Sequence, residues 1–362
     1  MDTALDLSSD LVSLTRAVCD LPSVSGDERV LADAIESTLR RYTHLEVLRD
    51  GDAIVARTNL GRSSRVVIAG HIDTVPIADN LPTRLVGEGA QAELWGRGTV
   101  DMKAGVAVQL ALAAELSEPT RDVSWVFYDH EEVAATLNGL GRIVREHPDW
   151  VKGDFAILGE PTNGGIEGGC NGTLRAEVRL TGVAAHSARA WMGSNAIHAA
   201  GEVLRRLEAY TPREVEVDGL VYRESLNAVL VSGGTAANVI PDSCVVTVNY
   251  RFAPSASVEQ ASAHVRELFD GYDVAIVDAA PGARPGLDDP LAQEFARAVL
   301  TITGGAPAAK YGWTDVARFS ELGVPAVNFG PGDPLLAHKQ DERCVVGQIT
   351  VVHAALRDWL TA

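Results

Sequence analysis

The sequence predicts an α/β fold, in which a mostly parallel sheet is flanked by helices and a smaller α+β domain is inserted. Three observations support this prediction. The 362 residues exceed the roughly 250–300 at which single hydrophobic cores stop growing, so two domains are expected. Short apolar runs alternate with helical patterns toward both ends of the chain, as in parallel sheets with crossover helices. Between these parts, strands alternate apolar with polar residues, which is typical of half-exposed antiparallel sheets.

The first clear element is an amphipathic helix in "SGDERVLADAIESTLRRY". Ser25 is expected to cap its N-terminus, because acidic residues fill the following turn and apolar residues then recur at helical spacing. The next elements are identified in the same way, with continuous apolar runs for buried strands and helical spacing for helices. In chain order they are a strand at 64–70, a helix at 102–116, a strand at 122–129, a helix at 137–147 and a strand at 154–160.

The inserted domain is expected at residues 173–282, which leaves 1–172 and 283–362 for the main domain. Its strands and long helices are expected at 172–182, 195–210, 243–254 and 257–271. The Pro- and Gly-rich stretch "APGARPGLDDP" is interpreted as a linker back to the main domain. After it the first pattern returns, with a helix at 291–304, a strand at 325–330 and a helix at 347–360.

Composition and charge exclude several classes of protein. The N-terminus is acidic where a secretion signal is basic, and no apolar run approaches the ~20 residues of a membrane span, so a soluble cytoplasmic protein is expected. A formal net charge of −18 argues against nucleic acid or an acidic membrane as partner, because both bind clustered Lys and Arg. The cysteines show no C-x-x-C pair and are expected to be reduced thiols: Cys19, Cys170, Cys244 and Cys344.

Polar clusters follow several predicted strands or lie in adjoining loops. They contain His71, Asp101, Glu131 with Glu132, Glu160 and His338. Successive clusters up to Glu160 are 28 to 30 residues apart, about one β-α unit, and the carboxyl ends of parallel strands share one edge of a sheet. Two imidazoles and three carboxylates form a mixed nitrogen and oxygen donor set that suits zinc or a similar divalent ion. One aspartate could bridge two ions.

Each cluster has a plainer interpretation when taken alone. A His at a strand end is more often structural than a metal ligand, and paired glutamates more often begin a solvated helix. Their coincidence at one predicted edge favours a metal site. A catalytically silent binding protein is disfavoured because the whole donor set is present, and a nucleotide-binding enzyme is unsupported because "GRGTVD" lacks the third glycine of G-x-G-x-x-G.

The motifs that contain these clusters resemble a known series. "GHIDTVP", "GRGTVDMKAG", "HEEV", "GEPT" and "AHKQDE" are similar to the motifs of the dinuclear zinc metallopeptidase and deacylase family that includes aminoacylases, glutamate carboxypeptidases and acetylornithine deacetylase. The resemblance implies two Zn²⁺ per subunit, which Co²⁺ or Mn²⁺ could replace. It implies that one ion is held by His71 and Glu160, the other by Glu132 and His338, and that Asp101 bridges them.

The resemblance also implies roles for residues around the metals. Asp73 would orient the imidazole of His71, and the peptide between Asp101 and Met102 would be cis. Glu131 would act as general base and then as general acid, because neighbouring residues at a strand end point in different directions and only Glu132 is needed as a ligand. His130 is expected to be structural, since H-E-E-V lacks the second His of H-E-x-x-H.

For the insert, the resemblance implies a dimerisation and lid domain. His186 would reach the active site of the partner subunit and stabilise the oxyanion, so the enzyme would be a homodimer. Asn238 and Arg251 match substrate-binding positions, and Arg251 offers a bidentate grip on a carboxylate. Thr314 lies in "YGWTDVARF", which departs from the usual Gly-Thr-Ser-Asp-Gly-Arg of the substrate loop.

The stretches around His186, Asn238 and His338 are most similar to enzymes that remove a succinyl group. The reaction that this implies is hydrolysis of N-succinyl-L,L-2,6-diaminopimelate to succinate and L,L-diaminopimelate, in lysine and cell-wall precursor synthesis. The alternative is the same chemistry on another N-acyl amino acid or a dipeptide, because the metal ligands are common to the whole family.

Overall fold

The structure is a computed structural model that describes residues 5–362. Residues 1–4 lie outside the described residues. The expectation for the N-terminus and the expected start of the main domain rest in part on them. The chain divides into two compact units. The first comprises the chain up to Gly168 with Pro285–Ala308 and Arg318–Ala362, and the second comprises Gly169–Arg284 with Ala309–Ala317.

The first unit is built on an eight-stranded sheet. Its strands, in spatial order, are β1 (Glu46–Asp50), β2 (Ala53–Arg57), β6 (Asp122–Tyr128), β3 (Arg65–His71), β7 (Phe155–Leu158), β18 (Ala326–Asn328), β8 (Glu167–Gly168) and β17 (Ala308–Ala309). The four strands β6, β3, β7 and β18 are parallel, whereas β2 joins β6 and β8 joins β18 in antiparallel pairs. All residues of β6 are buried, so both sheet faces are covered there. The expected α/β sheet is confirmed, with antiparallel flanks.

Helices cover the faces of this sheet. In this unit they are α1 (Leu11–Cys19), α2 (Arg29–Leu39), α3 (Lys103–Glu115), α4 (Gly139–Glu146), α7 (Pro290–Thr303), α9 (Val346–Thr361) and α8 (Val316–Glu321), which begins in the second unit. Short 3-10 turns are Gly89–Gln91, Pro148–Trp150 and Pro334–Leu336, and a small sheet joins β19 (Arg343–Val345), β5 (Glu93–Trp95) and β4 (Arg84–Val86). Helix α3 is apolar around nearly its whole circumference because it packs against α1, α9 and β3 at once.

The start of α2 differs from the prediction. The helix begins at Arg29 with Glu28 as its N-cap residue, so the expectation that Ser25 caps it is wrong. The hydroxyl of Ser25 instead donates to the Asp73 carboxylate at 2.6 Å, beyond the end of β3. Because this hydroxyl bonds to a buried carboxylate from another loop, it does not cap α2. The local sequence does not reveal that contact.

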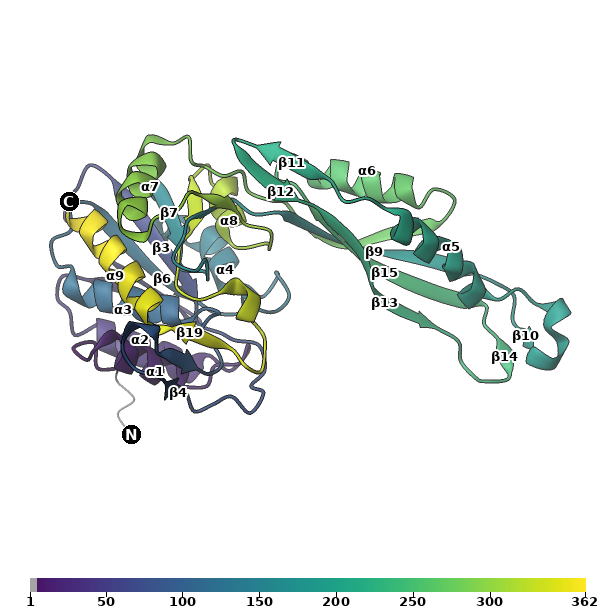
Figure 1. Ribbon diagram of the computed structural model, residues 1–362, viewed down its shortest axis with the longest axis horizontal. Coiled ribbons are helices and arrows are strands. Elements are labelled where there is room, and N and C mark those ends of the chain that lie inside the picture. Colours follow the sequence, from purple (N-terminus) through teal and green to yellow (C-terminus); the bar gives the residue numbers. More distant parts are fainter. Residues whose placement is uncertain (1–4) are drawn as a thin grey trace. The chain divides into compact units, whose positions relative to one another are not determined.

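The second unit contains a four-stranded antiparallel sheet in the order β13 (Ser225–Gly233), β15 (Ser243–Phe252), β9 (Gly172–Thr181) and β16 (Asp273–Ala280). Buried residues alternate along β9 and β15 and pack under α5 (Ala196–Ala209) and α6 (Val258–Leu268). Two small sheets pair β10 (Ala185–His186) with β14 (Val239–Ile240), and β11 (Glu214–Val217) with β12 (Leu220–Arg223); a 3-10 segment spans Ser187–Met192. In Figure 1, β10 and β14 lie beyond one end of the four-stranded sheet and β11 and β12 near the other.

The cysteines and the hydropathy of the helices bear on two expectations from composition. The four cysteines are buried free thiols, as expected. Among residues 5–362, no helix combines the length and the hydropathy needed to cross a membrane.

Candidate active site

Three adjacent parallel strands end together at one edge of the large sheet. β3 ends at His71, β6 is followed directly by the segment 129–132, and Glu160 comes two residues after β7. Because β3 lies between β6 and β7 in parallel register, these polar residues meet at the carboxyl edge, where open α/β sheets bind ligands.

Two loops complete the cluster. Asp101 lies just before α3, and its peptide bond to Met102 is cis, as the resemblance implies. His338 lies in the loop between β18 and β19, with a left-handed φ of 64°. The Nε2 atom of His71 is 3.1 Å from Asp101 Oδ1, and the Nε2 atom of His338 is 3.2 Å from Asp101 Oδ2. The two carboxylate oxygens of Asp101 therefore face different imidazoles.

The donor atoms form two groups of three that share Asp101. His71 and Glu160 belong to one group, and Glu132 and His338 to the other; within each group the donor atoms lie within 4.8 Å of one another. Glu131 joins a further group, with His71 and Glu132. Nitrogen and carboxylate donors converging in two sets around one shared aspartate fit a pair of divalent cations.

The electrostatic field of the cluster favours positive charge. Burial disfavours the imidazolium of His71, but hydrogen bonds to Asp101 and Asp73 outweigh it and hold the pKa of that ring well above its ordinary value. Hydrogen bonds to Asp101 and Glu132 raise the pKa of His338 to about 10. Desolvation opposes the ionisation of Asp101, yet its two histidine partners lower the pKa of that carboxyl. Carboxylates that stabilise two imidazolium ions would stabilise bound dications in the same way.

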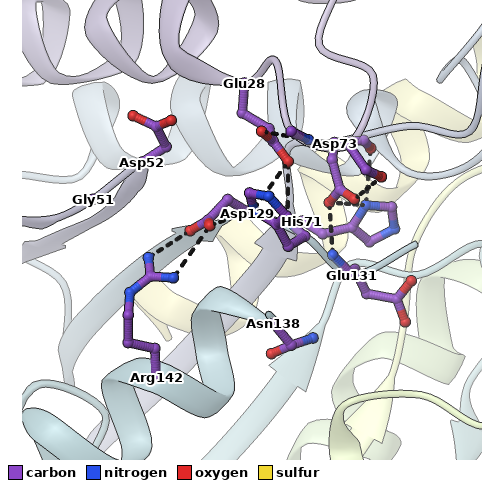
Figure 2. A network of polar contacts seen from close by, with 12 residues as sticks. Glu28, Gly51, Asp52, His71, Asp73, Asp129, Glu131, Asn138 and Arg142 are labelled. Carbon is purple, nitrogen blue, oxygen red and sulfur yellow. Dashed lines mark hydrogen bonds and ion pairs between the residues drawn. The ribbon is translucent and has the colours of Figure 1, made fainter. Parts of the chain in front are cut away.

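Asp73 connects the first histidine to the paired glutamates (Figure 2). The Nδ1 atom of His71 lies 3.0 Å from the backbone carbonyl of Asp73 and 3.4 Å from its Oδ1. The Asp73 carboxylate also accepts the backbone N–H groups of Glu131 and Glu132, each at 3.0 Å. Desolvation raises the pKa of this buried carboxyl, but its hydrogen bonds, first that to His71, outweigh it and lower the pKa to about 2. One ionised side chain thus orients an imidazole and holds the backbone of both glutamates.

The turn before Glu131 has its own support. His130 adopts a left-handed φ of 59°, a conformation that costs energy for a residue with a Cβ. Its N–H donates to the carboxylate of Glu28 at 3.2 Å, and its Nδ1 lies 2.6 Å from Asp129. Asp129 is also paired with Arg142 of α4 at 2.8 Å, as Figure 2 shows. These contacts keep the chain turned so that Glu131 follows in the direction of Asp73.

A close backbone approach fixes Glu160 relative to the helix after Asp101. A Cβ added at Gly105 in α3 would lie 2.3 Å from the carbonyl oxygen of Gly159, a distance that no side chain can occupy. Glycine at position 105 therefore allows α3 to touch the end of the segment that carries Glu160.

The second unit holds the four remaining predicted residues in two separate places. Arg251 lies on β15 opposite Thr173, at the end of the sheet where the chain enters this unit. Its Nε donates to Asn249 at 3.0 Å, and burial lowers the pKa of its guanidinium. The side chain of Thr314 is buried, and its carbonyl accepts the thiol of Cys170. Arg251 and Thr314 therefore both belong to the Cys170 end of the unit.

His186 and Asn238 lie beyond the opposite end. His186 pairs with Val239 between β10 and β14, its side chain is exposed, and the carbonyl of Asn238 accepts the N–H of Ser187 at 2.9 Å. β9 runs for 10 residues between the two ends, which corresponds to about 30 Å. Within one chain, His186 and Arg251 cannot contact the same small molecule.

In a comparison with known proteins, residues 67–362 match peptidase family M20/M25/M40. The succinyl-diaminopimelate desuccinylase of Corynebacterium glutamicum is 48% identical over 368 residues, covering 99% of this chain and 98% of that protein. A Mycobacterium tuberculosis protein that carries the same name provisionally is 55% identical over 359 residues, covering 98% and 99%.

Among solved structures, a tripeptidase from Staphylococcus aureus superposes with a TM-score of 0.80 and covers 99% of this chain and 98% of its own. Its sequence is only 18% identical, so this likeness concerns the fold.

Proposed function

Because the chain belongs to peptidase family M20/M25/M40, we propose that it removes succinate from N-succinyl-L,L-2,6-diaminopimelate. Membership makes it a metal-dependent hydrolase. The observation that supports this substrate is the identity of 48% or more to desuccinylases along nearly the whole chain, including the second unit. We place the reaction in the cytoplasm, where four free buried cysteines are the expected state of the thiols.

The proposed metal site consists of two zinc ions per subunit. His71 and Glu160 would hold one ion, Glu132 and His338 would hold the other, and Asp101 would bridge them. The division of the donor atoms into two groups with Asp101 in common supports this assignment. When bound, such ions lower the pKa of water and polarise the amide carbonyl.

In the proposed mechanism Glu131 moves the proton. Its carboxylate accepts a proton from the attacking water and delivers it to the nitrogen of the departing amine. The backbone of Glu131 is fixed by the ionised carboxylate of Asp73, so the base is oriented by the residue that also orients His71. Adjacent Glu132 is left to bind metal.

We assign substrate contacts to the inserted domain (173–282), which would serve as the dimerisation and lid domain. A further contact is assigned to Thr314, which belongs to the second compact unit but lies within the main catalytic domain (1–172 and 283–362) by the boundaries expected from the sequence. Arg251, Asn238 and Thr314 would bind the substrate, Arg251 through a carboxylate. His186 would stabilise the oxyanion. Since Arg251 and His186 lie at opposite ends of one sheet, their action on one substrate molecule requires His186 of a second copy of the chain.

The edge strand β13 supports a homodimer. Its exposed side chains include Val229, Leu230 and Val231, and Leu230 is 68% exposed. An edge strand with apolar exposed residues is suited to pair with another copy. We expect Leu230→Lys to weaken dimerisation at least about 10-fold, measured by sedimentation velocity over a concentration series. Val277→Lys on the opposite edge strand is the control; a wild-type monomer, or an equal effect of both changes, contradicts the assignment.

Shared active sites predict complementation between two inactive variants. Co-expressed Glu131→Gln and His186→Ala chains should form mixed dimers in which one site carries both changes and the other carries neither. Random pairing then restores about a quarter of wild-type activity. Activity that stays at the level of the separate variants would contradict a His186 that acts across the dimer.

Parallel assays test the substrate. Zinc-loaded protein is incubated with N-succinyl-diaminopimelate, N-acetylornithine and a simple dipeptide, and the release of primary amine is measured. We expect kcat/KM to be highest by far for the succinyl compound. Preference for either other substrate would keep the metal chemistry and overturn the substrate.

A further inference from the structure

We propose that Glu342 is a positioning residue that fixes the bridging aspartate Asp101 relative to His338. The inference rests on the proposed metal site and extends it to a residue that binds no metal. Glu342 comes four residues after His338, and it is 1% exposed.

The contacts of Glu342 cross from one metal-binding loop to the other. Its Oε1 accepts the backbone N–H of Val100 at 2.9 Å and that of Asp101 at 3.3 Å. Its own carbonyl accepts the N–H of Gly96 at 3.0 Å. The segment that leads into Asp101 is thus bound to the segment that follows His338 at two points.

Arg97 completes the arrangement and is itself 3% exposed. Its Nη1 lies 2.7 Å from Glu342 Oε2 and donates to the carbonyl of Lys339 at 3.3 Å. Its Nε donates to the carbonyl of Pro76, in the loop that follows His71. The buried pair therefore holds three loops together. Two of them carry the proposed metal ligands Asp101 and His338, and the third follows the strand that ends at the ligand His71.

This arrangement bears on metal binding because Asp101 is the residue common to both donor groups. Its side chain faces His71 and His338, while its backbone is held by Glu342. A shift of the backbone at Asp101 would misplace a donor for both ions. Groups that orient metal ligands typically alter metal affinity by 10–100-fold when they are removed.

A purely structural role is the alternative, since a buried ion pair contributes to folding wherever it lies. Asp122 offers a matched control. It is 4% exposed, accepts the N–H groups of Leu60 and Arg62, and begins β6, at the opposite end of the strand from Glu131. Its removal should destabilise the fold without displacing a donor.

Two conservative variants separate position from charge. Glu342→Asp keeps the charge facing Arg97 but shortens the side chain, so its oxygens withdraw from the N–H groups of Val100 and Asp101. Glu342→Gln keeps an oxygen at the reach of those N–H groups but removes the charge. With Asp122→Asn as the control, the measurements are Tm without metal, zinc content, and zinc affinity by competition with a chromophoric chelator.

We expect a crossed pattern. Glu342→Asp should lower zinc affinity about 10-fold or more, whereas Glu342→Gln should lower Tm more and affinity less. Asp122→Asn should lower Tm and keep wild-type affinity. Zinc affinity that follows Tm across all three variants, or is retained in Glu342→Asp, overturns the proposal. Wild-type protein that binds two zinc ions but leaves the succinyl substrate intact overturns the proposed function alone, because no measurement here uses the substrate.

Discussion

Replacement of Glu131 by Gln is expected to lower kcat by about 10²–10⁴-fold while both divalent ions stay bound. The amide cannot accept the proton from water, but it has nearly the same size and leaves the backbone bond to Asp73 in place. KM should change little, since the substrate contacts proposed for Arg251 and Asn238 are untouched. Steady-state kinetics and elemental analysis of the same preparation measure both quantities.

Glu132→Gln is the matched control, because the two glutamates are neighbours and share the Asp73 contact. This variant should lose the zinc ion that Glu132 shares with His338. Its kcat should recover in part when zinc is added in excess. Excess zinc should have no effect on Glu131→Gln. Turnover near the wild-type rate in Glu131→Gln would remove Glu131 from its role.

Replacement of Asp101 by Ala should have the largest effect of all on metal content. Asp101 belongs to both donor groups, so its loss removes a ligand from each ion and leaves the remaining carboxylates and imidazoles without a bridge. We expect zinc content to fall from two ions toward none, and activity to fall to the background rate.

His338→Ala is the comparison for Asp101→Ala, because His338 belongs to only one of the two donor groups. It should keep the ion assigned to His71 and Glu160, with about one zinc per chain. Retention of two ions by Asp101→Ala, or loss of both by His338→Ala, would contradict the bridging assignment.

The strand ends could be predicted from the sequence because two local signals coincide there. Unbroken apolar runs identify buried parallel strands, and polar residues directly after such runs must meet at one edge. His71 at the end of β3 and Glu160 after β7 are examples, and the structure brings both together with Asp101. His338 could not be placed by periodicity, since it follows a loop of irregular sequence. Its inclusion in the predicted donor set rested on the coincidence of the polar clusters and on the resemblance of its motif.

Contacts between distant loops could not be predicted. Ser25 has the local signature of a helix cap, yet its hydroxyl bonds to Asp73, 48 residues away. Glu342 occurs in the motif "AHKQDE", but its contacts could not be predicted, because its partners Val100 and Asp101 are more than 240 residues away along the chain. Local propensity describes the neighbours of a residue along the chain, whereas these roles depend on how the loops pack.

The motifs likewise could not predict the separation of His186 from Arg251. The motifs identify both residues, but only the run of β9 shows that they lie at opposite ends of one sheet. That separation gives a physical reason for the dimer that the resemblance implies.

The central claim, two ions bridged by Asp101, is tested most directly by a crystal structure of the zinc-loaded protein with anomalous diffraction at the zinc edge. We expect two peaks per chain, about 3.5–4 Å apart, with Asp101 between them. His71 and Glu160 should coordinate one peak, and Glu132 and His338 the other. A single peak, or two peaks whose ligands do not include Asp101, would contradict the account.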